Sequence, residues 1–138
     1  MKTRHWFLTL SVAFGLLLTG CGQEEMTAFQ TVSSGPYQIT LLAPGGVLKS
    51  GENTIAVQVS QNGQPVDVEQ AELMFSMPQM GAMPYMETRA QFAQPVDAAT
   101  VDGTITFNMG GSWNGNVQVT TPGGPAGGTF QLHVEERE

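Results

Sequence analysis

The sequence predicts an all-β protein, folded as a single immunoglobulin-like antiparallel β-sandwich of about seven strands. Apolar and polar residues alternate with a period of two in five segments, which is the pattern of strands that bury one face. Turn sequences that contain glycine separate these segments. No window of a dozen residues after Cys21 shows the 3.6-residue period of a helix.

Each of the five segments has its own set of apolar residues expected to face the core. In chain order they are Tyr37, Ile39 and Leu41; Ile55, Val57 and Val59; Ile105, Phe107 and Met109; Val117 and Val119; and Phe130, Leu132 and Val134. The polar neighbours, Gln58 among them, are expected to face solvent. By the same alternation His133 faces outward.

The breaks between these segments have turn chemistry. Asn62-Gly63 and Asp102-Gly103 tolerate the positive φ that tight hairpins require, so we expect a turn at each. Glycine pairs mark the other breaks: Pro44-Gly45-Gly46, Gly110-Gly111, Pro122-Gly123-Gly124 and Gly127-Gly128.

The N-terminus has the features of a bacterial lipoprotein signal peptide. Lys2, Arg4 and His5 are followed by an uncharged apolar run from Trp6 to Leu18. That run is shorter than the ~20 residues of a membrane-spanning helix and fits a secretory signal. It ends in Leu18-Thr19-Gly20-Cys21, which resembles a lipobox. We therefore expect a signal peptide over residues 1–20 and lipidation, including palmitate-type acylation, at Cys21.

The chain after the signal peptide is long enough for one domain. We expect residues 21–35 to be the lipidated cysteine and a flexible tether, and residues 36–138 to be the sandwich. Cys21 is the only cysteine, so no disulfide forms within the chain. Three basic residues remain against 12 acidic ones, a formal charge of −9. Such a surface excludes nucleic acid as a partner and polybasic attachment to lipid, so the membrane contact is the acyl anchor.

These features predict a membrane-anchored lipoprotein of the cell envelope, facing the periplasm or the cell exterior. Residue 22 is glycine, where an aspartate would be expected to hold a Gram-negative lipoprotein in the inner membrane. The sequence therefore favours the outer membrane in a Gram-negative host and leaves a Gram-positive surface open.

Five methionines lie at strict three-residue spacing in the segment Met74–Met86. Thioethers suit Cu(I) and suit hard cations poorly. Pro78 and Pro84 favour extended geometry before them, and a bend at Gly81 would bring neighbouring thioethers together around one ion. We expect Met77, Met80 and Met83 to be the ligands, with Met86 and Met109 in reserve.

Each of these residues also has a purely structural interpretation. Methionine fills irregular gaps in a core, so the segment could pack against its own domain. Met109 shares parity with Ile105 and Phe107, which favours the core, whereas Met74 is out of phase with Leu73 and Phe75. Trp113 could lie over a bound cation. A tryptophan buried beside a glycine turn is the alternative.

Several blocks, taken in order, resemble the YtkA-like domain, which is related to FixH-type proteins and occurs in heavy-metal efflux adaptors. The blocks are Leu48–Asn53 before a strand, Asn62–Pro65, Ala71–Leu73 running into Met77–Met83, and Phe107–Trp113. The resemblance covers residues 36 to 120, and it implies a small extracytoplasmic β-sandwich associated with copper handling or oxidase assembly. The chain departs from the family pattern by an extra glycine before Trp113 and by a second Met-Pro repeat over residues 83–86. It also lacks the transmembrane helix of FixH-type proteins.

Two functions from different classes follow. In the first, the protein binds Cu(I) through its methionine-rich loop and buffers it or passes it to an envelope copper protein or efflux component. In the second, it is a metal-free interaction module that docks another envelope protein through an exposed Met-Pro surface. We expect no enzymatic activity, because one histidine after the signal peptide, no free thiol and scattered carboxylates assemble no catalytic constellation.

The lipobox gives the first testable prediction. Replacing Cys21→Ser removes the atom that is acylated, so precursor should accumulate and labelling with fatty acid should disappear. Metabolic labelling with detergent partitioning measures both. A variant that is labelled and partitions as the original chain does would contradict the lipidation.

Overall fold

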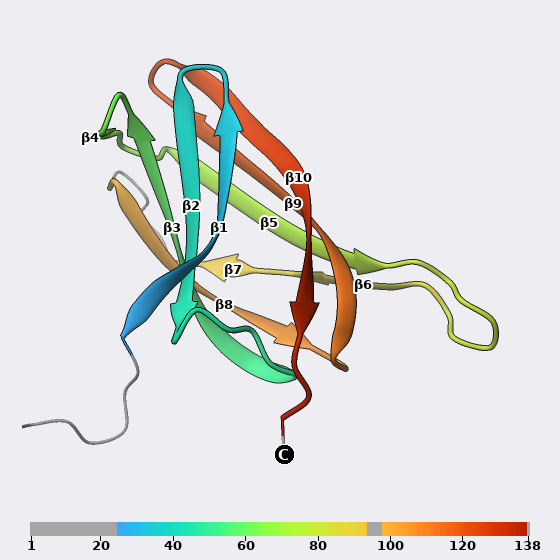
Figure 1. Ribbon diagram of the computed structural model, residues 1–138. Helices are drawn as coiled ribbons and strands as arrows, with labels where there is room; N and C mark the ends of the chain where they lie inside the picture. Colours follow the sequence, from blue (N-terminus) through green and yellow to red (C-terminus); the bar gives the residue numbers. More distant parts are fainter. Residues whose placement is uncertain (1–24, 94–97, 138) are drawn as a thin grey trace, which may run out of the picture.

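The fold is an antiparallel β-sandwich, described by a computed structural model for residues 25–93 and 98–137 (Figure 1). The expected signal peptide over residues 1–20 and the lipidation site Cys21 lie outside the described residues. Within the described residues there is no helix, and so none that is long and apolar enough to span a membrane.

The described residues form ten strands in two sheets. The strands are β1 (Met26–Ser34), β2 (Tyr37–Pro44), β3 (Gly51–Gln61), β4 (Gln64–Pro65), β5 (Gln70–Met77), β6 (Met86–Arg89), β7 (Gln91–Phe92), β8 (Thr100–Phe107), β9 (Gly111–Thr121) and β10 (Gly124–Val134). One sheet has the order β1-β2-β3-β8-β7, with β4 paired to β3, and the other has the order β10-β9-β5-β6. The predicted class is confirmed, although ten strands replace the expected seven. The additional β4, β6 and β7 have two to four residues each, too few to show an alternation.

The predicted inner faces are confirmed along the central strands. Ile39, Leu41, Ile55, Val57, Val59, Ile105, Phe107, Val117 and Val119 are all buried, while Gln38, Gln58 and Gln118 are exposed. Three aromatic side chains join the two sheets at the centre of this core. Phe107 packs edge-to-face with Phe75, with ring centroids 5.1 Å apart, and with Trp113 at 5.2 Å. Such pairs stabilise a core beyond the apolar area that they bury.

Most of the segment expected to be a flexible tether, residues 21–35, is instead strand β1. Residues 26–34 pair with β2 along its whole length, from Met26 opposite Pro44 to Ser34 opposite Tyr37. The sequence of β1 does not reveal the strand, because the register shifts between Ala28 and Gln30 and Val32 is its only buried residue. An edge strand that buries so little shows no apolar alternation, so the domain begins about ten residues earlier than expected.

Two of the expected turns lie inside strands. Asn62-Gly63 does form a turn, with φ of 53° and 77°. Asp102-Gly103, however, lies within β8, where a Cβ on Gly103 would stand 2.6 Å from the carbonyl oxygen of Gln91 on β7. Gly127-Gly128 lies within β10, where a Cβ on Gly128 would stand 2.5 Å from the side chain of Val32 on β1. In both places the missing side chain allows a second strand to approach closely.

Strand β1 and the hairpin between β5 and β6 lie on opposite flanks of the sandwich, because β1 is an edge of one sheet and packs beside β10, while β6 is an edge of the other sheet and packs beside β8 (Figure 1). Met26, at the start of β1, is opposite Pro44, and the β2–β3 connection beyond it is joined to the end of β10 by a bridge between Lys49 and Glu135. At the same end β9 begins at Gly111, opposite Val134, and β5 ends beside it. From there the β5–β6 hairpin extends beyond the rest of the molecule (Figure 1).

The assignment of faces gives the second prediction. Val57 has 0% of its surface exposed and Gln58 on the same strand is exposed. Val57→Asp places an unpaired charge in the core and should lower the free energy of unfolding by about 3–5 kcal/mol. Gln58→Asp should change it by less than about 0.5 kcal/mol. Urea unfolding followed by circular dichroism measures both, and equal losses would mean that the assignment of the two faces of β3 is wrong.

Candidate metal site in the methionine hairpin

The five methionines of the segment lie on one β-hairpin. Strands β5 and β6 pair antiparallel, with Met74 opposite Arg89 and Met77 opposite Met86. The same register continues past the ends of both strands to Met80 and Met83, which form an isolated antiparallel bridge. Four of the methionines are therefore two cross-strand pairs, Met77 with Met86 and Met80 with Met83.

The tip of the hairpin is a two-residue turn. The amide of Met80 donates to the carbonyl of Met83 at 3.1 Å, and the amide of Met83 donates to the carbonyl of Met80 at 2.8 Å. Gly81 is the first turn residue and has a φ of 55°, a conformation that glycine adopts without strain. The bend expected at Gly81 is therefore present, and it brings Met80 and Met83 opposite each other.

The three-residue spacing places successive methionines on opposite faces of the hairpin. Side chains alternate along an extended chain, so residues three apart point to opposite sides. Met77 is 3% exposed, while Met80 and Met83 are 57% and 36% exposed. The two pairs differ in the same way, with Met77 and Met86 on the core side and Met80 and Met83 on the outer side.

Met77 is part of the hydrophobic core. Its terminal methyl group lies 3.2 Å from the place that a Cβ on Gly111 would occupy, at the start of β9. The expected convergence of Met77, Met80 and Met83 around Gly81 is thus not the arrangement of the structure. The expectation assumed a polyproline-like step, which keeps residues three apart on one face, whereas the hairpin follows strand geometry, which does not.

The reserve ligands also lie on the core side. Met86 and Met109 are half-buried and pack against the core. The carbonyl of Met109 accepts a hydrogen bond from the indole of Trp113 at 3.2 Å. Trp113 is itself 1% exposed and packs against Phe107, the arrangement of a buried tryptophan beside a glycine turn. A cation could reach its ring only by entering the core.

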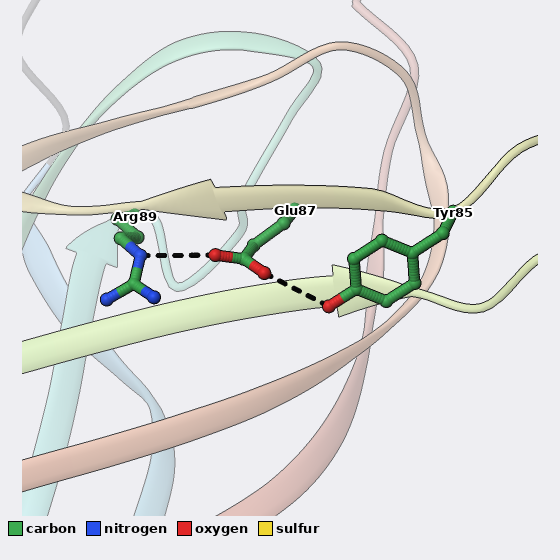
Figure 2. Close-up of polar contacts among 3 residues, drawn as sticks. All are labelled: Tyr85, Glu87 and Arg89. Atoms are coloured by element: carbon green, nitrogen blue, oxygen red, sulfur yellow. Dashed lines mark hydrogen bonds and ion pairs between the residues drawn. The ribbon is translucent and has the colours of Figure 1, made fainter.

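Tyr85 is the functional candidate that the sequence reasoning missed. It is 55% exposed, and its place two residues after Met83 puts it on the same outer face of the hairpin. Figure 2 shows Glu87 and Arg89 on β6 and Tyr85, the residue just before that strand. The Tyr85 hydroxyl donates to Glu87 at 3.1 Å, and Arg89 contacts the other carboxylate oxygen of Glu87 at 3.1 Å. The sequence contains one signal for Tyr85: it stands two residues after Met83, and that spacing puts two side chains on the same face of a strand.

Other surfaces offer less for a metal. Among the described residues, no group of three or more histidine, cysteine, aspartate or glutamate side chains could hold an ion. His133 is exposed on β10. Met74, on the outer face as its phase indicated, lines two shallow grooves of about 380 and 470 Å³ together with Asn116 and other polar residues. Within the described residues, the exposed thioethers at the hairpin tip are the arrangement best suited to a soft cation.

Comparison with known proteins agrees with this architecture. The family model for YtkA-like domains matches residues 31–119. No curated protein matches the chain. Among solved structures, a DUF4426 family protein from Pseudomonas aeruginosa is similar, with a TM-score of 0.52 and 14% sequence identity, over 79% of this chain and 99% of that one. At that identity the similarity bears on the fold alone.

The two faces of the hairpin give the third prediction. Met77→Ala should leave a cavity in the core and lower the free energy of unfolding by about 2–5 kcal/mol. Met80→Ala, at the exposed tip, should change it by less than about 0.5 kcal/mol. Denaturant titration of the two variants beside the unmodified protein makes the measurement, and a large loss in Met80→Ala would show that the tip is packed.

Proposed function

The chain belongs to the YtkA-like family, and from that premise we propose that it is a lipid-anchored protein of the cell envelope that binds Cu(I) through its methionine hairpin and buffers or transfers it. The observation that carries the proposal is the exposed pair Met80 and Met83 at the hairpin tip. The anchor in this proposal is the acylated Cys21, and the favoured location in a Gram-negative host is the outer membrane.

The geometry of the pair supports coordination of one ion. Residues directly opposite on antiparallel strands have Cβ atoms about 4.5–5.5 Å apart. A methionine side chain has three rotatable bonds, so two of them at that separation can turn their sulfur atoms toward a common point. The mutual hydrogen bonds of Met80 and Met83 hold the two Cβ atoms in place while the side chains adjust.

The chemistry of the donors supports Cu(I). Thioethers are soft ligands that select Cu(I) over hard cations. They carry no proton in the free state, so acid does not compete for the site as it does at histidine or cysteine sites. Binding by Met80 and Met83 should therefore persist at acid pH.

Two thioethers leave the ion accessible, which suits transfer better than storage. Tyr85 lies on the same face, and its ring could contact the bound cation, the role first considered for Trp113. An acceptor that offers a further soft ligand could take the ion from the exposed tip. The acceptors that we propose are an envelope copper protein or an efflux component. In this proposal Met77, Met86 and Met109 pack in or against the core and do not bind the ion.

A metal-free docking function is the second candidate, and one observation favours it. Among the described residues, the large hydrophobic side chains that are exposed are Met80, Met83 and Tyr85, all in this hairpin. An exposed apolar cluster of this kind is typical of contact with another molecule. Measured Cu(I) binding distinguishes the two candidates.

The fourth prediction concerns the sulfur atoms. Met80→Leu and Met83→Leu keep size and apolarity, so stability should change by less than about 1.5 kcal/mol. Each should lower the affinity for Cu(I) by at least about tenfold, since one of two donors is lost, equivalent to about 1.4 kcal/mol. Competition with a chromophoric Cu(I) chelator measures the affinity.

Met77→Leu is the matched control, because it removes a sulfur from the same segment on the buried side and should bind Cu(I) as the unmodified protein does. Ag(I) should compete for the site and Zn(II) should not. If the unmodified protein binds no more Cu(I) than the Met80→Leu, Met83→Leu double variant, the hairpin is a docking surface and the metal function is wrong.

A further inference from the structure

The methionines of the domain differ in how far water reaches their sulfur atoms. Met80 and Met83 are 57% and 36% exposed, whereas Met77 is 3% exposed. The other methionines of the described residues are half-buried: Met26, Met74, Met86 and Met109. Oxidation of a thioether requires a dissolved oxidant to touch its sulfur, so exposure ranks the methionines by susceptibility. The two methionines at the hairpin tip stand first in that ranking.

The tip is suited to a neutral oxidant. The ten residues from Met77 to Met86 include no Asp, Glu, Lys or Arg. Twelve acidic residues against five basic ones give the whole chain a formal charge of −7. A negative surface repels anionic oxidants and has no such effect on a neutral one. A hydroperoxide, with hydrogen peroxide as the simplest, is therefore the class of oxidant that fits.

The reaction is a two-electron oxidation of sulfur. A sulfur lone pair of Met80 or Met83 attacks one oxygen of hydrogen peroxide, so that an S–O bond forms and the O–O bond breaks. The departing hydroxide takes the proton of the transferred oxygen and leaves as water. Thioether and peroxide thus become sulfoxide and water, with no further co-reactant. The sulfoxide presents a hard oxygen in place of a soft sulfur donor, and Cu(I) binds hard donors poorly.

Oxidation at the tip leaves the core intact. The backbones of Met80 and Met83 bond to each other, and the two side chains point to the outer face, so a sulfoxide oxygen there stays in water. At Met77 the same oxygen would have to enter the core, where the terminal methyl group already lies against Gly111. Burying a polar atom without a partner is costly. The tip alone can therefore be oxidised while the domain stays folded.

The shape of the hairpin makes the oxidised side chains accessible for repair. Methionine sulfoxide is reduced back to methionine by two reductases, one for each epimer at sulfur. Such an enzyme has to enclose the oxidised side chain in its active site. Every residue from 78 to 85 is exposed, and the hairpin extends beyond the rest of the molecule (Figure 1). A sulfoxide at the tip is thus within reach of another protein.

We propose that Met80 and Met83 form a reversible oxidation switch, in which a hydroperoxide converts their thioethers to sulfoxides and releases Cu(I) from the hairpin. Reduction of the sulfoxides restores the site. The inference rests on the Cu(I) binding of the proposed function and adds the condition under which the ion is released. The environment outside the cytoplasm is oxidising, which is where an envelope protein meets such oxidants.

The test uses the full acylated chain in detergent micelles, free of copper during oxidation because Cu(I) itself reacts with peroxide. Hydrogen peroxide is added in graded doses, and peptide mapping by mass spectrometry measures the sulfoxide at each methionine. We expect sulfoxide to form severalfold faster at Met80 and Met83 than at Met77, with an unchanged circular dichroism spectrum. Ag(I), which is redox-inert, should slow oxidation of the tip pair because it engages a lone pair of each sulfur.

The affinity for Cu(I) is then measured by chelator competition after the peroxide has been removed. It should fall by at least about tenfold on oxidation, as on loss of one of two donors, and return after treatment with reductases for both epimers. The Met80→Leu, Met83→Leu double variant is the matched control, since its residual affinity should not respond to peroxide. Met77→Leu should respond as the unmodified protein does.

Two results would overturn the switch while the proposed function stands. One is an oxidised protein that keeps its affinity for Cu(I), and the other is oxidation of Met77 as fast as that of Met80. Unmodified protein that binds no Cu(I) would overturn the proposed function, and the switch with it, whichever methionine is oxidised first.

Discussion

The register of β5 against β6 is the constraint on which the candidate site depends. It is fixed at the base, where Met77 enters the core against Gly111 and stands opposite Met86. With that pair facing inward, strand alternation turns the next pair, Met80 and Met83, to the outer face. A shift of one residue would turn Met77 away from the core and place the tip methionines on the core-side face instead. The exposed thioethers are therefore a consequence of how Met77 packs.

The core that holds Met77 is itself built around aromatic contacts between the sheets. Phe75 on β5 packs against Phe107 on β8, and Phe107 packs against Trp113 on β9. Phe130 on β10 lies over Gly115, where any side chain would collide with its ring, and packs edge-to-face with Phe75 at 5.6 Å. The base of the hairpin is thus held by residues from both sheets, while the contacts of the tip lie within the hairpin itself, namely the two backbone hydrogen bonds of Met80 and Met83 and the hydrogen bond of Tyr85 to Glu87. Because the core contacts are made at the base, the tip can keep Met80 and Met83 exposed without any loss of core packing.

The two proposed roles of the tip use different properties of the same residues. Coordination of Cu(I) uses the sulfur lone pairs of Met80 and Met83, while docking of a protein partner uses the exposed apolar surface of the same residues.

The sequence by itself determined the fold class, the inner faces of the central strands and the segment that carries the candidate site. It could do so because burial of one face enforces a period of two, and because five methionines in one uncharged segment are visible without a fold. It did not determine that residues 26–34 form β1, because an edge strand with one buried residue shows no period. Nor did it distinguish glycines of turns from Gly103 and Gly128, which admit a neighbouring strand. Which methionines share a face was decided only by the tertiary structure, since three-residue spacing keeps side chains together in a polyproline-like chain and separates them in a hairpin.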